Sequence, residues 1–162
     1  MKSSIFKYIT ILGIFIILFS CNEDDSSILI NDEGSIEVED LTITGEILVL
    51  VNQHRQEVGL EALKRNAIAD ELAIKHTNYM IAQSNISHDD FNLRFQELQQ
   101  KVNAYSAGEN VASGYQDASS VVNGWLNSSG HKANIEGNYT HIGLAAIKDP
   151  QGKYYFTQLF YR

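Results

Sequence analysis

Three short motifs in the second half of the sequence place polar side chains beside small residues. Such motifs at the ends of predicted elements allow side chains to converge on a cleft. Two imidazoles can bind a divalent metal, and a carboxylate can bind the metal, orient a histidine or act as a base. The motifs are Ser87-His88, Gly108-Glu109-Asn110, and the segment Trp125–Asn134 with Ser128 and His131.

Each motif taken alone also has a simpler interpretation. His88 precedes two aspartates, which is typical of a surface loop. Glu109 follows a glycine and can accept hydrogen bonds from turn amides, and His131 can cap a helix. The spacing therefore indicates a candidate His88–Glu109–His131 site without establishing it.

Apolar periodicity predicts the helices that position these residues. One helix is expected from Ile43 to about Val58, and a second from about Ala67 to Gln83. His76 continues the apolar stripe of the second helix, which favours a hydrogen-bonded core histidine over a ligand. A short helical segment is expected near residues 91–98, and Asp117 is suited to cap a further helix.

Strands are expected mainly near the end of the chain. Gly108–Ser113 is predicted to be a short strand. Residues 141–147 and 153–161 alternate with period two around Asp149-Pro150-Gln151-Gly152, which is typical of a hairpin turn. Helices followed by a hairpin predict an α+β domain in which helices cover an antiparallel sheet.

The N-terminus has the pattern of an export signal. A basic start and a short apolar run end at Cys21, and the residues before this cysteine resemble a lipobox. We expect residues 1–20 to be a signal peptide and Cys21 to carry a lipid that anchors the chain to a membrane. Since Cys21 is the only cysteine, it forms no internal disulfide. An uncleaved membrane helix is the alternative.

The negative charge of the chain is concentrated in one segment. The formal net charge is -8, and 8 of the 20 acidic residues lie between Cys21 and Leu41. Residues 21–42 are therefore expected to form an acidic linker, and residues 43–162 the domain. The acidic charge excludes nucleic acid as a partner, because phosphate binding needs clustered Lys and Arg. Acidic residues directly after such a cysteine resemble surface-export signals of Bacteroidetes lipoproteins, so an outer-membrane lipoprotein facing either the surface or the periplasm is expected.

The motifs together resemble the bacterial CAP/SCP-like family over about residues 43–161. They occur in the family order, and the resemblance implies an α-β-α sandwich with a cleft of two histidines and two acids that holds a divalent metal in some members. By position, His88 and His131 match the histidines and Glu109 matches the first acid, whereas Ser128 stands in place of the second. The matching segments are Asn52-x-x-Arg55, His76-x-x-x-Met80, Ser87-His88, Arg94, Gly108–Ala112, Val122–Trp125, Gly130–Ile135, His141–Gly143 and Tyr155–Phe160.

Three functions are compatible with this resemblance. The first is a binding module whose cleft, with His88, Glu109, Ser128, His131 and Asn134, takes a divalent metal (zinc above all) or a small envelope, lipid or peptide ligand. The second is a hydrolase, using Glu109 as the base for a metal-bound water or a relay of Ser128, His131 and Glu109. The third is an adhesion or scaffold surface.

Overall fold

The computed structural model of the chain describes residues 28–30, 36–38 and 42–162. The predicted signal peptide and Cys21 lie outside these residues. Within the predicted linker, the short strands β1 (Ile28–Ile30) and β2 (Ile36–Val38) pair in antiparallel fashion. No helix among the described residues has both the length and the apolar character needed to cross a membrane.

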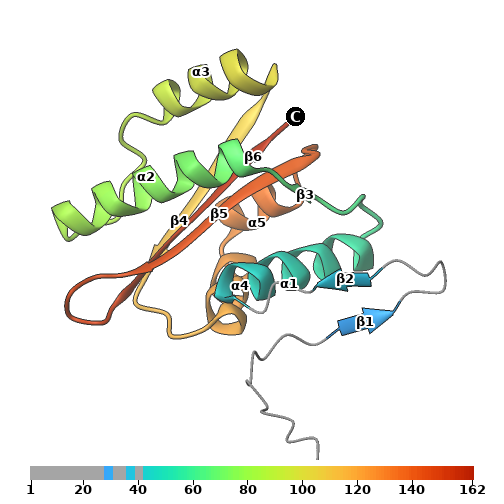
Figure 1. Cartoon of the computed structure of the whole chain (residues 1–162), viewed down its shortest axis with the longest axis horizontal. Helices are drawn as coiled ribbons and strands as arrows, with labels where there is room; N and C mark the ends of the chain where they lie inside the picture. The colour runs from blue at the N-terminus through green and yellow to red at the C-terminus, as the bar shows by residue number, and fades with distance from the viewer. Residues whose placement is uncertain (1–27, 31–35, 39–41) are drawn as a thin grey trace, which may run out of the picture.

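The domain after the linker alternates helices with the strands of one four-stranded sheet (Figure 1). The elements in chain order are α1 (Ile43–Glu57), β3 (Lys64–Arg65), α2 (Ala67–Gln83), α3 (Phe91–Val102), β4 (Ala107–Ser113), α4 (Ala118–Leu126), α5 (Ser129–Ile135), β5 (His141–Lys148) and β6 (Tyr154–Tyr161).

The sheet lies between two layers of helices. Its strand order is β3-β5-β6-β4, with β5 and β4 antiparallel to β6 and the two-residue β3 parallel to β5. Helix α2 packs on β5 and β6 with α3 beside it, whereas α1, α4 and α5 form the other layer. The predicted α-β-α sandwich is confirmed, apart from the short parallel strand.

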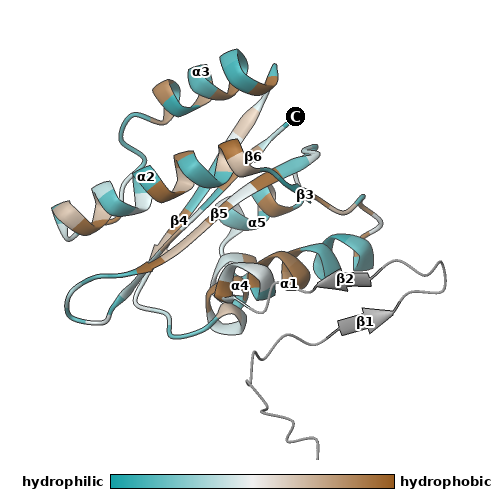
Figure 2. Cartoon of the chain, viewed as in Figure 1, coloured by the Kyte–Doolittle hydropathy of each residue, from teal (hydrophilic) through white to brown (hydrophobic). Residues whose placement is uncertain are grey.

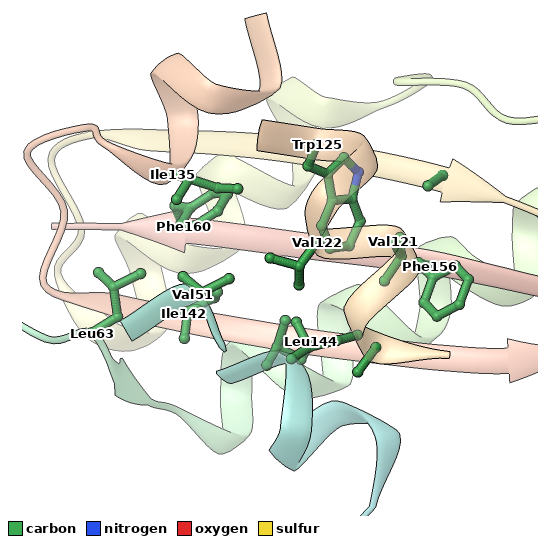
Figure 3. Packing of buried hydrophobic residues seen from close by; sticks show 13 residues of the cluster. Val51, Leu63, Val121, Val122, Trp125, Ile135, Ile142, Leu144, Phe156 and Phe160 are labelled. Carbon is green, nitrogen blue, oxygen red and sulfur yellow. The ribbon is translucent and has the colours of Figure 1, made fainter. Parts of the chain in front are cut away.

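The larger core lies between the sheet and the layer of α1, α4 and α5 (Figure 3). Trp125 of α4 is 2% exposed and meets Phe156 of β6 edge to face. Its indole N–H donates to the carbonyl of Val111, so the side chain fixes α4 against β4 as well as filling space. Figure 2 shows hydrophobic residues where α1 and α4 meet and hydrophilic residues in the β5–β6 turn.

Local signals account for most element boundaries. Asn66 caps α2, and Asp117 caps α4 in a capping box, as expected for such residues. The predicted hairpin turn forms, with the N–H of Gly152 bonded to the carbonyl of Asp149 and a φ of 83° at Gly152. The prediction for α3 began at the right residue but ended four residues early, and α5 was missed, since no side-chain cap marks its N-terminal end.

Asn52 and Arg55 fix α1 to neighbouring loops. The side chain of Asn52 exchanges two hydrogen bonds with the backbone of Leu63. Arg55 is 2% exposed, and its guanidinium donates to four backbone carbonyls, those of Glu61, Ile135, Gly137 and Tyr139. Burial lowers the pKa of Arg55 from its ordinary value.

Candidate functional site

A buried ion pair between Arg94 and Glu109 lies at the centre of the candidate site. Arg94 projects from α3, and its Nε and Nη2 donate to the two carboxylate oxygens of Glu109 at 2.7 and 2.8 Å. The two side chains are 9% and 2% exposed. Because both oxygens of Glu109 accept hydrogen bonds from a fixed cation, this carboxylate is held in one orientation.

Glu109 in turn orients His88. The Nδ1 atom of His88 lies 2.9 Å from Oε1 of Glu109. An ionised carboxylate only accepts hydrogen bonds, so Nδ1 carries the proton and Nε2 of the neutral ring is bare. The side chain of His88 is 54% exposed, which leaves it accessible to solutes. A carboxylate that holds one imidazole nitrogen while the other is free is the usual support of a metal-binding histidine.

The loop that carries His88 is held by the same group of side chains. The carbonyl of Ser87 accepts from Nε2 of His76 at 2.7 Å, and the carbonyl of Asp89 accepts from Nη1 of Arg94 at 2.7 Å. Tyr79 donates to the carboxylate of Asp89 at 2.9 Å. The loop between α2 and α3 is therefore tied down on both sides of His88.

His76 is a buried, hydrogen-bonded histidine, as its place in the apolar stripe indicated. It is 3% exposed, and its Nε2 lies 3.7 Å from Oε1 of Glu109 in addition to its bond with the loop. Burial lowers its pKa most strongly, whereas the charge of Glu109 acts in the opposite direction. His76 thus supports the loop as a neutral ring.

His131 belongs to the opposite layer of helices. It lies in the first turn of α5 and lines a hollow of about 270 Å³ together with Ser128, Ile86 and Trp125. Burial lowers the pKa of His131 most strongly, and the electrostatic effect of His88 lowers it further. The described residues contain no hydrogen bond between Ser128 and His131, and Glu109 contacts His88 instead of His131.

The structure therefore does not bring all the predicted site residues into contact with one another. Glu109 and His88 are in direct contact, whereas His131 and Ser128 line the adjacent hollow and Asn134 bonds to the backbone of β4. Sequence reasoning gave no role to Arg94. Its signal in the sequence was weak, since an arginine on a largely polar helix is normally solvated.

The candidate site residues provide only some of the ligands that a metal ion needs. Among the described residues, no group of three or more His, Cys, Asp or Glu is arranged to hold a metal ion. The oxygens of Glu109 are taken by Arg94 and His88, so they are poor candidates for ligands or for a base. Two imidazoles remain, His88 and His131, and imidazole suits zinc and copper.

The histidines predict how stability depends on pH. The pKa values of His76, His131 and His141 are all lowered from 6.5, chiefly by burial. Above about pH 7.5 these rings are almost entirely neutral in both states, so they add little pH dependence to stability. Below it the unfolded chain takes up protons that the folded chain resists, and the free energy of unfolding falls, by at most about 1.4 kcal/mol per pH unit for each histidine.

Urea titrations between pH 7.5 and 5 measure this decline. His76→Gln, whose amide can still donate to the loop, is expected to reduce the slope. A slope unchanged in that variant would show that His76 does not titrate between the two states.

Comparison with known proteins identifies the family. Residues 48–160 match the model of the cysteine-rich secretory protein family, CAP. The chain belongs to this family. Two curated Bacillus subtilis relatives are an uncharacterized membrane protein, YlbC, 34% identical over 121 residues, and an uncharacterized protein, YkwD, 33% identical over 110 residues. The matches cover 71% and 64% of this chain but only 33% and 42% of those proteins.

Solved structures share the fold. An extracellular protein containing an SCP domain from Bacillus anthracis aligns with a TM-score of 0.64 at 31% identity, over 74% of this chain and 40% of that one. An outer surface protein of Borrelia burgdorferi aligns with a TM-score of 0.67 at 20% identity, over 85% of this chain and 98% of that one. The second likeness is one of fold alone.

Proposed function

We propose that this protein is an exported, membrane-anchored CAP-domain lipoprotein whose cleft binds a divalent transition metal through His88 and His131. The observation that carries the proposal is the 2.9 Å contact between Nδ1 of His88 and Glu109, which leaves the exposed Nε2 bare. Zinc suits a pair of neutral imidazoles. With two protein nitrogens, affinity is modest, and water or a bound ligand fills the other positions.

The hollow beside His131 supports a small second ligand. Its wall combines the apolar side chains of Ile86, Val111 and Trp125 with the polar groups of Ser128 and His131. A small envelope molecule or lipid fragment with an apolar body and a polar head matches this lining. When bound, a metal would supply a positive charge to the polar head. Glu109 keeps the His88 ring in the binding tautomer, and Arg94 holds the carboxylate of Glu109 in place.

Zinc titration of the purified protein by calorimetry tests the metal proposal. Wild type is expected to bind one zinc, and His88→Ala and His131→Ala are each expected to lower affinity at least about tenfold, since each removes one of two ligands. His54→Ala is the matched control, because His54 pairs with Glu136 on a different part of the domain. Binding that is equally strong in all three variants would contradict the proposal.

Export and anchoring have a separate basis. They are supported by the lipobox-like residues at Cys21 and by the extracellular SCP-domain relative. Fractionation of cells that express the Cys21→Ser variant tests the anchor. The substitution removes the thiol that would carry the lipid, so the variant is expected to be released from the membrane. Protease treatment of intact cells then distinguishes surface from periplasmic attachment. Membrane association unchanged in the variant would exclude lipid at Cys21.

A further inference from the structure

Two consecutive residues of β4 hold the two cleft histidines from opposite sides of the sheet. Neighbouring side chains of a strand point to opposite faces. Glu109 faces the α2–α3 layer and holds the ring of His88. Asn110 faces the α4–α5 layer, and its Nδ2 donates to the backbone carbonyl of His131 at 3.1 Å.

Asn110 belongs to a network of three amide side chains. Its Nδ2 also donates to Oε1 of Gln158 at 3.0 Å, and its Oδ1 accepts from Nδ2 of Asn134 at 2.8 Å. Nδ2 of Asn134 donates as well to the carbonyl of Glu109 at 3.0 Å. Asn110 and Gln158 face each other in the register of β4 and β6, and both are 0% exposed.

Backbone carbonyls fix the direction of two amides in this network, those of Asn110 and Asn134. The carbonyls of Glu109 and His131 lie at its two ends and can only accept hydrogen bonds. Asn134 must therefore turn its NH2 toward β4, and Asn110 must turn its NH2 toward α5 and Gln158. Only one arrangement of Asn110 and Asn134 satisfies both ends.

Helix α5 depends on such outside contacts for its position. It has seven residues, Ser128 makes no side-chain cap, and a helix of this length is unstable by itself. Ile135 anchors its C-terminal end in the core. The side-chain hydrogen bonds between α5 and β4 come from this amide network: Asn110 contacts the carbonyl of His131 near the N-terminal end of α5, and Asn134 contacts β4 near the C-terminal end.

Gln158 also shows an unfavourable feature that packing does not explain. Its Nε2 is buried and has no hydrogen-bond partner among the described residues. An unpaired buried donor is destabilising, and an apolar side chain of similar size would avoid that cost. The contribution that offsets it is Oε1, which accepts from Asn110 and holds its amide in the orientation that contacts His131.

We infer that Asn110 and Gln158 are positioning residues for His131, and that the Glu109-Asn110 pair sets how the two histidines face each other. Asn110 acts on the main chain of His131, and Gln158 acts on Asn110. The expected effect of these residues on metal affinity rests on the proposed function. Their expected effect on the stability of α5 does not depend on it.

Three shape-conserving variants test this inference. Asn110→Leu and Gln158→Met remove the amide groups. The matched control is Thr157→Val, because Thr157 precedes Gln158 on β6 and bonds to Thr77 at 2.7 Å on the other face of the sheet. Each variant is examined for zinc affinity by calorimetry and, without metal, for amide hydrogen exchange in α5 and α4.

Asn110→Leu and Gln158→Met are expected to lower zinc affinity about tenfold, as loss of supporting contacts does at metal sites. They are also expected to speed exchange in α5 about tenfold with little change in α4, whereas Thr157→Val leaves zinc affinity and the α5-to-α4 exchange ratio within about twofold of wild type. If Asn110→Leu does not fold, the zinc affinity and α5 exchange of Gln158→Met alone test the inference.

Two results would overturn the inference. One is unchanged α5 exchange in both amide variants, and the other is equal acceleration throughout the domain in all three variants. If wild type fails to bind zinc, the proposed metal function is wrong, yet the exchange rates of α5 still decide whether the amides position His131.

Discussion

Arg94→Met is expected to lower the free energy of unfolding by about 3–5 kcal/mol at pH 7, because it leaves the carboxylate of Glu109 buried without its cation. The remaining neighbours are weak substitutes. His88 offers Glu109 one hydrogen bond from a side chain that is 54% exposed, and His76 lies 3.7 Å away with its proton directed to Ser87. Urea denaturation of wild type and variant measures the loss.

A second variant distinguishes two causes of this loss of stability: the unpaired buried charge of Glu109 and the missing contacts of the Arg94 side chain. In Arg94→Met/Glu109→Leu both charges are gone, and most of the stability is expected to return, because apolar replacement of a whole buried pair is often neutral. The control is Lys101→Met, which removes a 2.9 Å ion pair with Glu97 from the exposed side of α3 and is expected to leave stability unchanged within error. A double variant as unstable as the sum of its single variants would contradict this account.

The sequence predicted the fold well because its signals are local. Apolar stripes, the caps Asn66 and Asp117, and the Asp149–Gly152 turn are each contained in a few consecutive residues. Helix α5 and strand β3 were missed because their stability is not local. The first is held by amide contacts with β4, and the second is a two-residue pairing with β5.

The candidate site was predictable in part for a related reason. His88, Glu109 and His131 were found through residue type and motif order, but the roles of the residues depend on partners distant in sequence. Whether Glu109 acts as base, ligand or support depends on Arg94, 15 residues away, whose side chain turns inward from a polar helix. Pairing of this kind has no signature in periodicity, so the sequence left the role of Glu109 open.

The contact between α2 and β5 determines how the α2 side of the site is assembled. Gly143 of β5 faces α2, and a Cβ atom added there would lie 2.6 Å from Cβ of Ala69 and nearer still to the Ala69 carbonyl group. Directly beside it, Asp70 accepts from the N–H of Leu144 at 2.8 Å. Backbone thus meets backbone at this point, and α2, which carries His76, is seated on the sheet as closely as it can be.

Gly143→Ala is therefore expected to lower the free energy of unfolding by about 3 kcal/mol, because the added methyl group must push α2 away from β5 and stretch the Asp70 bond. Thermal and urea denaturation measure the loss. Gly130→Ala is the matched control, since a Cβ there meets nothing within 4 Å. Adding Ala69→Gly to the variant removes only the Cβ overlap, so it is expected not to restore stability. Recovery in that double variant would mean that a side-chain methyl, and not the main chain of α2, sets the distance between helix and sheet.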